Sequence, residues 1–293
     1  MISNENYKIA SGGEGFIIRR ASRFEINFAI EAAASEVWNP GLYDGDTFYT
    51  TDPDGFFVGT VHRSIIGCIS AINYGNFGFI GFYIIKPEFR GKGYGIKLWK
   101  TAIDYLKEVK CIGLDGVVDQ QNNYMESGFK LAYRNIRYEG ITSNKKTKSI
   151  NLTELSNVSF ESLLKYDNKF FPAARKQFLL SWINQPKSKA VAFLEKEILK
   201  GYGVIRKCRT GYKVGPLFAN NKTIAEEIFL SLISSVEEGL PFYLDTPEVN
   251  PEAKELVEKY SMKKVFETAR MYKGEDPQLP VQNIFGVTTF ELG

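Results

Sequence analysis

Apolar residues follow two different spacings along this chain, and together they predict an α/β protein. Phe77 to Ile85 is apolar at odd and even positions, which is typical of a strand buried on both faces of a sheet. Farther on, Ile96, Trp99 and Ile103 recur at helical spacing with lysines between them. A buried strand, a glycine-rich turn and an amphipathic helix are therefore expected in that order.

The same periodicities predict the other elements. Helices are expected at 23–38, 119–127, 159–184 with a break at Pro172, 222–237 and 251–260. Strands are expected at 16–20, 55–61, 64–74, 111–118, 129–139, 189–195, 200–207, 211–218, 240–245 and 265–272. Residues 38–55 are rich in Pro, Gly and Asp and predict a long loop, which in compact domains is often functional. The apolar tail 281–293 predicts a closing strand for either half.

The order of elements repeats, which predicts two copies of one fold. The segment 128–138 (GFKLAYRNIRY) aligns without gaps on 261–271 (SMKKVFETARM). Between the copies, 141–150 is polar and basic and predicts a linker. The expected domains are therefore 1–140 and 151–293, in agreement with about 150 residues per domain.

Charge and cysteine content exclude several classes of protein. The chain has 37 Lys and Arg against 34 Asp and Glu, without long basic runs, so no nucleic-acid partner is expected. Three cysteines without CxxC spacing indicate a reducing compartment, and the N-terminus carries no apolar signal-peptide core. The longest apolar run is about half a membrane span. We expect a cytoplasmic protein without a membrane partner.

The segment Arg90-Gly-Lys-Gly-Tyr-Gly95 carries the sharpest chemical signal. It lies between the buried strand and the helix, where glycines and free N–H groups suit an anion such as a pyrophosphate. It is not a Walker A loop, because no GK[ST] sequence ends it, and its Gly spacing does not fit a dinucleotide fingerprint. A plain glycine-rich turn is the alternative.

Two motifs resemble those of the GNAT superfamily of acyl-CoA-dependent N-acyltransferases. Arg90, Gly93 and Gly95 fit its [QR]-x-x-G-x-[GA] signature, and Tyr124 stands four residues before Gly128-Phe129, as in that family. Further segments (38–44, 120–129, 167–175 and the terminal FELG) look like two-domain YitH-like GNAT proteins. The resemblance implies two tandem GNAT-like domains of the α/β (α+β) class, each with a mixed, mostly antiparallel sheet flanked by helices.

The resemblance also implies an acetyl-CoA site and its residues. Backbone groups of Ile84 and Ile85 would lie along the pantetheine and thioester, and Tyr124 would protonate the departing thiolate. Asn123 would contact the cofactor or cap a turn. For Tyr124, a structural role in the core is the alternative to that of general acid. The remaining cofactor residues would be those of the anion loop, Arg90, Gly91, Lys92, Gly93, Tyr94 and Gly95. The second half has Ala219-Asn-Asn-Lys-Thr223 where a glycine loop would stand, so no CoA site is expected there.

Several residues are candidates for the general base and the acceptor site. Relatives often carry a Glu on the fourth strand, but 77–85 contains no carboxylate. Water, Asp44 or Asp46 from the long loop would then take the proton, with Asp115 a weaker candidate; turn formation is the alternative role of the loop aspartates. Trp38 and Tyr43 would help to line an aromatic acceptor pocket or fill a core.

The remaining candidates are an Asp–Arg pair and the single histidine, and each also fits a structural role. Asp167 and Arg175 are two helical turns apart and predict a structural ion pair or an acceptor pocket between the halves. The single histidine, His62, is expected on the surface at a hairpin turn, so no metal site is expected.

Together these features predict direct acetyl transfer from acetyl-CoA to a primary amine. The acceptor is expected to be a small molecule, with a protein amine as the alternative. An acyl-CoA sensor without turnover and an enzyme with a longer acyl donor are the other readings. A monomer is expected, because two fused copies satisfy an interface that single-domain relatives make by dimerising.

Overall fold

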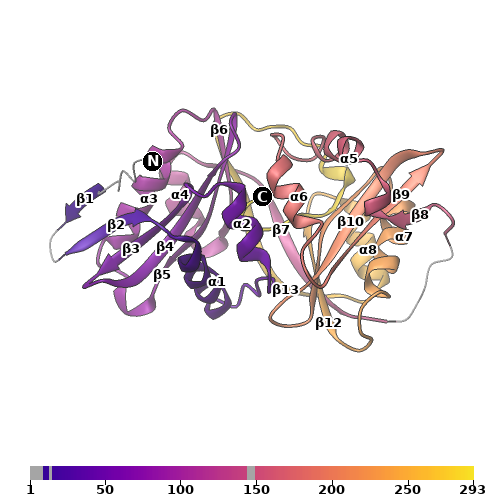
Figure 1. The fold of residues 1–293 in the computed structure, drawn as a ribbon, viewed down its shortest axis with the longest axis horizontal. Coiled ribbons are helices and arrows are strands. Elements are labelled where there is room, and N and C mark those ends of the chain that lie inside the picture. The colour runs from indigo at the N-terminus through magenta and orange to yellow at the C-terminus, as the bar shows by residue number, and fades with distance from the viewer. Residues whose placement is uncertain (1–8, 13–14, 144–148) are drawn as a thin grey trace, which may run out of the picture.

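Fourteen strands form one sheet in the part of the chain that the structure, a computed structural model, describes: residues 9–12, 15–143 and 149–293. The centre of the predicted linker, 144–148, lies outside the described residues. The two repeats lie side by side, and the C-terminal end reaches the middle of the molecule between them (Figure 1).

The predicted helices and strands follow the predicted order, and the structure adds short elements at 9–12, 44–51 and 152–154 that periodicity did not predict. The strands of the first half are β1 (Ile9–Gly12), β2 (Phe16–Arg20), β3 (Phe56–Val61), β4 (Ser64–Asn73), β5 (Phe77–Ile85), β6 (Cys111–Val117) and β7 (Lys130–Ile141). Its helices are α1 (Ile26–Ser35), α2 (Asp44–Thr51), α3 (Tyr94–Tyr105) and α4 (Gln121–Glu126). The second half has β8 (Leu152–Glu154), α5 (Phe160–Asp167), α6 (Lys176–Trp182), β9 (Ser188–Glu195), β10 (Ile198–Lys207), β11 (Tyr212–Ala219), α7 (Lys222–Ile233), β12 (Pro241–Pro247), α8 (Pro251–Lys259), β13 (Lys263–Lys273) and β14 (Ile284–Gly286).

The two halves exchange their last long strands. The strand order is β5-β6-β13-β7-β12-β11, so β13 of the second repeat lies between β6 and β7. Strand β7 of the first repeat in turn pairs with β12, from Ile141 opposite Pro241 to Asn135 opposite Pro247. The repeats therefore follow one another along the chain, whereas their last strands cross over and join both halves into one sheet.

Each half contains one pair of parallel strands that separates after a few residues. In the first half β5 and β6 pair only from Phe77–Cys111 to Ile80–Leu114. In the second half β11 and β12 pair only over three residues, 212–214 with 242–244. There the tail fills the opening, because β14 pairs with β11 and the Val287 N–H donates to the Asp245 carbonyl at 2.8 Å.

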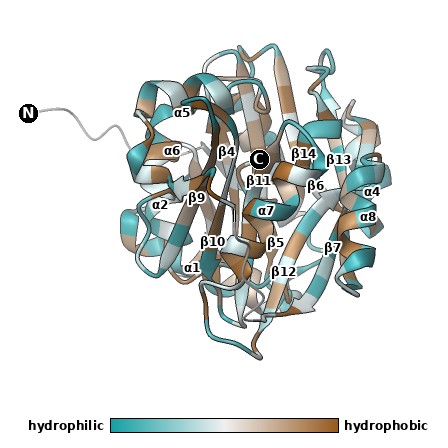
Figure 2. Ribbon diagram, turned by 90° about the vertical axis from the view of Figure 1, so that its right-hand side faces the viewer, coloured by the Kyte–Doolittle hydropathy of each residue, from teal (hydrophilic) through white to brown (hydrophobic). Residues whose placement is uncertain are grey.

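Helices cover both faces of the sheet, with their polar faces outward and apolar strands inside (Figure 2). One face has separate cores, in which α3 and α4 cover the first half and α7 and α8 the second. On the other face α1, α2, α5 and α6 share one core with the tail. In this shared core Phe48 of α2 stacks on Trp182 of α6, with ring centroids 6.1 Å apart. Side chains of both halves thus pack into one core on this face of the sheet.

The prediction of a continuous loop over 38–55 was wrong, because α2 occupies its second part. Thr47 and Phe48 of this helix are fully buried, and the Thr47 hydroxyl lies 2.8 Å from that of Ser181 on α6. Packing against the other half stabilises a helix that its local sequence does not favour. The tail does supply a strand, β14, and it pairs within the second half.

Candidate functional site

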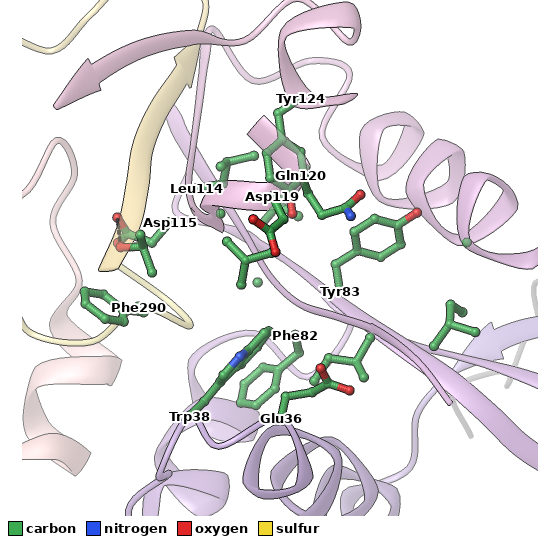
Figure 3. Close-up of a pocket in the computed structure, with 18 of the residues that line it drawn as sticks. Glu36, Trp38, Phe82, Tyr83, Leu114, Asp115, Asp119, Gln120, Tyr124 and Phe290 are labelled. Carbon is green, nitrogen blue, oxygen red and sulfur yellow. Dashed lines mark hydrogen bonds between the residues drawn. The ribbon is translucent and has the colours of Figure 1, made fainter. Parts of the chain in front are cut away.

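A cleft of about 790 Å³ opens where β5 and β6 separate (Figure 3). Its walls come from both strands, the turn before α3, the segment after β6, and the distant β13 and tail. The lining residues used below are Glu36, Trp38, Gly81, Phe82, Tyr83, Ile84, Ile85, Arg90, Gly91, Gly95, Asp115, Asp119, Gln120, Tyr124, Phe266, Glu267, Thr268, Phe290 and Glu291. Residues from 36 to 291 thus meet around one opening.

The start of α3 is open for an anion. Its N-cap is Gly93, with φ 77° and no side-chain hydrogen bond, so the first backbone N–H groups have no cap from a side chain. A Cβ at Gly91 or Gly93 would have no heavy atom within 4 Å, which indicates open space beside both residues. At Gly95 a Cβ would lie 2.7 Å from the Tyr83 hydroxyl, so a larger residue there would displace the end of the Tyr83 side chain.

The predicted cofactor residues fall into two groups. Ile84, Ile85, Arg90, Gly91 and Gly95 line the cleft, and Lys92, Gly93 and Tyr94 complete the same turn. The charged side chains of this turn have protein partners. Arg90 donates to the Ile85 carbonyl at 2.8 Å and pairs with Glu36, while the Lys92 ammonium lies 5.2 Å from the Phe89 ring centroid. Backbone groups are therefore the main donors that the turn offers.

Asn123 does not line the cleft. Its amide donates to the Gln120 side chain at 2.7 Å, and Gln120 is the residue that reaches the cleft. The amide pair fixes the end of the segment that follows β6. Contact of Asn123 with the cofactor stays a prediction.

A bulge distorts β5 beside the cleft. The register with β4 shifts between Gly81 opposite Ser70 and Ile84 opposite Cys68, and Phe82 takes the left-handed φ of 47°. A non-glycine residue in this region is strained, and such strain often occurs at functional sites. The bulge frees backbone groups of β5 from the ladder at the place where the strands separate.

Tyr124 reaches the cleft from α4. Its ring packs 5.5 Å from Trp99 and against Gly116, where any Cβ would collide with it. Burial raises the pKa of Tyr124 above its ordinary value of 10, with a smaller contribution from Tyr83. Tyr124 is therefore a neutral phenol at neutral pH and holds a proton that it can donate.

The opposite wall of the cleft is aromatic and acidic. Trp38, Phe82 and Phe290 all line the cleft and supply its aromatic surface (Figure 3). Asp115 accepts two hydrogen bonds from Arg270, at 3.0 and 2.5 Å, and one from Asn135 at 2.8 Å. This ion pair occupies its carboxylate, so Asp115 is unsuited to the role of general base.

Only Trp38 of the four predicted acceptor residues reaches the cleft; Tyr43, Asp44 and Asp46 do not line it. Asp44 is fully buried, where it pairs with Arg206 at 2.9 Å and accepts from the Gly41 N–H at 2.8 Å. Asp46 is exposed and pairs with Arg23. The formation of α2 turns these carboxylates toward the other half and toward solvent.

Sequence reasoning expected the second half to help form the acceptor pocket, but it missed which residues do so. Phe266, Glu267 and Thr268 come from β13, and Phe290 and Glu291 from the tail. Strand exchange brings β13 beside β6, and the local sequence carries no signal of that exchange. The apolar tail was the one available signal, although it predicted a strand rather than a wall of the site.

Asp167 and Arg175 form a buried ion pair away from this cleft, with hydrogen bonds of 2.8 and 2.9 Å. Arg175 also donates to the Gly293 carbonyl and the Thr288 hydroxyl, both at 2.9 Å. This network belongs to the tail anchor. Among the described residues no group of three His, Cys, Asp or Glu could hold a metal ion. Nor does any helix in that part of the chain have the length and apolar character to cross a membrane.

Comparison with known proteins identifies the family. The model of the acetyltransferase (GNAT) family matches residues 25–129, and that of an acetyltransferase (GNAT) domain matches 163–286. The chain belongs to the GNAT family as a tandem acyltransferase. Both halves carry the GNAT fold, and the resemblance seen in the two motifs is confirmed.

Full-length relatives of this tandem GNAT protein are known. The chain is 27% identical over 290 residues to holothin acyltransferase of Pseudoalteromonas sp. (strain SANK 73390), covering 99% of this chain and 98% of that one. A putative acetyltransferase from Pyrococcus horikoshii superposes with a TM-score of 0.84 at 20% identity, over 99% of this chain and 100% of that one. A tandem GNAT protein from the clavulanic acid biosynthesis pathway gives 0.62 at 10% identity, over 89% and 99%. The two solved structures share the fold.

Proposed function

We propose that this GNAT protein transfers an acetyl group from acetyl-CoA to a primary amine of a small molecule. The observation that carries the proposal is one continuous cleft that joins the uncapped start of α3 to the phenol of Tyr124 and then to an aromatic, acidic wall. Anion binding, proton donation and amine binding are thereby available in one opening.

The residues around α3 fit the donor. Open space beside Gly91 and Gly93 gives a pyrophosphate access to the backbone N–H groups, which the positive end of the helix dipole reinforces. Ile84 and Ile85 lie beyond Ile80, where β5 has separated from β6, and main-chain groups on that edge are positioned to bind the pantetheine arm and the thioester oxygen.

Tyr124 supplies the proton that the leaving thiolate takes up. Because burial raises its pKa, the phenol is protonated at the pH at which an amine reacts. The amine attacks the thioester carbon directly, which forms the C–N bond and breaks the C–S bond without a covalent enzyme intermediate.

The acceptor wall supports a small amine. Trp38, Phe82 and Phe290 offer ring surfaces to an ammonium or an aromatic group, and carboxylates outnumber cations among the lining residues. Both halves enclose this wall, which favours a small molecule over a protein tail. The name of the Pseudoalteromonas relative, holothin acyltransferase, supports transfer to a specific compound. The shared sheet also supports a monomer, since the last strand of each half has its partners within the chain.

A panel of primary amines with acetyl-CoA tests the proposal. Release of free CoA thiol and the mass of the acetylated product are measured, with octanoyl-CoA as a competing donor. Turnover that depends on the amine and prefers the acetyl donor is expected. Preference for octanoyl-CoA would indicate a longer acyl donor. Acetyl-CoA binding without turnover on any amine would indicate a sensor, and acetylation of a peptide lysine alone would indicate a protein acceptor.

A further inference from the structure

The tail passes through both halves before it ends. After β14 has filled the opening between β11 and β12, residues 288–293 cross to the first half and lie against β5. The main chain of Glu291 lies so close to Gly81 that any Cβ there would collide with its carbonyl group. Gly81 directly follows Ile80, the last β5 residue paired with β6, so the tail brings Glu291 to the point where the two strands separate.

Three hydrogen bonds from Tyr74 and Arg175 hold the tail in this position, and a fourth lies within the tail. The Tyr74 hydroxyl donates to the Leu292 carbonyl at 3.0 Å, and Arg175 donates to the Gly293 carbonyl and the Thr288 hydroxyl at 2.9 Å each. The Glu291 N–H donates to the Thr289 hydroxyl at 3.1 Å. Phe290 packs over Arg137, whose guanidinium carbon lies 4.9 Å from the ring centroid. These contacts fix the backbone on both sides of Glu291.

The carboxylate of Glu291 is buried but has no ion-pair partner within 4 Å among the residues that the structure describes. The Thr289 hydroxyl donates to it. The Arg137 and Arg206 guanidinium groups interact with it electrostatically, and both form close pairs with other carboxylates, Asp245 and Asp44. Lys213 completes this set of charges, and its ammonium donates to the carbonyls of Trp38 and Asn39.

The other carboxylates of the cleft are engaged or solvated. Asp115 pairs with Arg270, Glu36 with Arg90, and Glu267 with Lys264. Asp119 is exposed to solvent on the opposite side, beside Gln120. Glu291 is therefore the buried cleft carboxylate whose oxygens the described ion pairs do not occupy.

We propose that Glu291 is the general base, so that the tail of the second half supplies the carboxylate that β5 of the first half lacks. The proposal rests on the proposed amine acyl transfer. Glu291 takes one proton from the substrate ammonium, which frees the nitrogen lone pair for attack on the thioester carbon. As the C–N bond forms and the C–S bond breaks, Tyr124 gives its proton to the sulfur, and the second nitrogen proton passes through solvent to restore the Tyr124 phenol. Glu291 then releases its proton to solvent, so one proton leaves for each ammonium acylated.

The test compares Glu291→Gln and Glu291→Asp with Glu139→Gln, a control on the central strand β7 outside the cleft. The probes are acetyl-CoA with tryptamine, an alkylamine that is mostly protonated at neutral pH, and aniline, which is mostly neutral. In Glu291→Gln, kcat for tryptamine should fall at least 100-fold at pH 7, within the usual range for acid–base catalysis. The loss should shrink toward pH 10, where free amine becomes abundant, and should be smaller for aniline. Glu291→Asp should recover part of kcat, and Glu139→Gln should match the wild type.

Calorimetry separates catalysis from binding. Glu291→Gln should bind CoA as the wild type does, and tryptamine should bind its CoA complex with less than a threefold change in Kd. A large loss of tryptamine affinity with kcat preserved would make Glu291 a binding residue only and overturn the proposal. Loss of kcat in Asp119→Asn but not in Glu291→Gln would transfer the role to Asp119. Wild-type protein that acetylates neither these probes nor any other amine would overturn the proposed function itself, and the proposal with it.

Discussion

The two GNAT halves cap their equivalent helices differently, and this difference supports the proposal of a ligand site in the first half. In the first half α3 begins at Gly93, which has no side chain to cap the helix. In the second half α7 begins at Asn221, whose side chain accepts from the Ile224 N–H at 3.0 Å. The protein itself satisfies the second helix start, whereas the first leaves its donors for an external anion.

The gaps between the separating parallel strands also differ, because only that of the first half is open. Between β5 and β6 the first half has a cleft, whereas between β11 and β12 the second half has β14 and Val287. Extending the alignment of the repeats four residues upstream places Val257, a buried core residue, opposite Tyr124, and their carbonyls accept equivalent hydrogen bonds from Met262 and Phe129. The second half thus lacks the open helix start, the cleft and the phenol. It contributes a wall and the tail instead.

The largest expected effect concerns the tail anchor in the second half. Arg175→Leu should lower the free energy of unfolding by about 3–5 kcal/mol, because it leaves the Asp167 carboxylate buried without its cation. Urea unfolding followed by fluorescence measures the loss. The double variant Arg175→Leu/Asp167→Leu should lose less than the sum of the two single variants, and additive losses would contradict a coupled pair.

Replacing the phenol in the first half tests the functional difference between the halves. Tyr124→Phe should lower kcat by about 100-fold or more while the KM for acetyl-CoA changes little. Val257→Ala, at the aligned position of the second half, should affect stability but not kcat per folded molecule. Equal effects of the two changes on kcat would contradict the assignment.

The pH dependence follows from the raised pKa of Tyr124. A general acid is active in its protonated form, so activity is lost as the pH rises through its pKa. Because burial raises that pKa above 10, kcat of the wild type should show no alkaline loss from this group below pH 10. A decline in kcat centred near pH 8 that disappears in Tyr124→Phe would contradict this reasoning.

The smallest effect is expected at the capped helix of the second half. Asn221→Ala should lower the free energy of unfolding by about 1 kcal/mol, the usual cost of losing an N-cap, and should leave acetyl-CoA affinity unchanged. Thermal unfolding and calorimetry measure the two quantities. A weaker acetyl-CoA affinity in this variant would point to a ligand in the second half.

Local patterns were sufficient to predict most elements, because each strand and helix has its own periodicity. They were insufficient for the strand exchange, since β7 and β13 descend from similar segments and either could pair with β6. The glycine loop and Tyr124 could be proposed from motifs, because each motif consists of residues close in sequence.

The acceptor wall could not be predicted because long-range contacts build it. Asp44 looks like a loop carboxylate in the sequence, but Arg206, 162 residues away, pairs with it in the core. Glu291 comes to Gly81 through a tail that first crosses the other half. Contacts between residues so far apart in the sequence cannot be predicted from local composition.

The central claim is that only the first half binds acyl-CoA, and calorimetric titration with acetyl-CoA tests it most directly. The wild type should bind one molecule per chain. Gly93→Trp, which places a bulky side chain at a left-handed glycine in the anion loop, should weaken binding at least 100-fold and leave the circular dichroism spectrum unchanged. Two molecules per chain, or undiminished binding by Gly93→Trp, would contradict the claim.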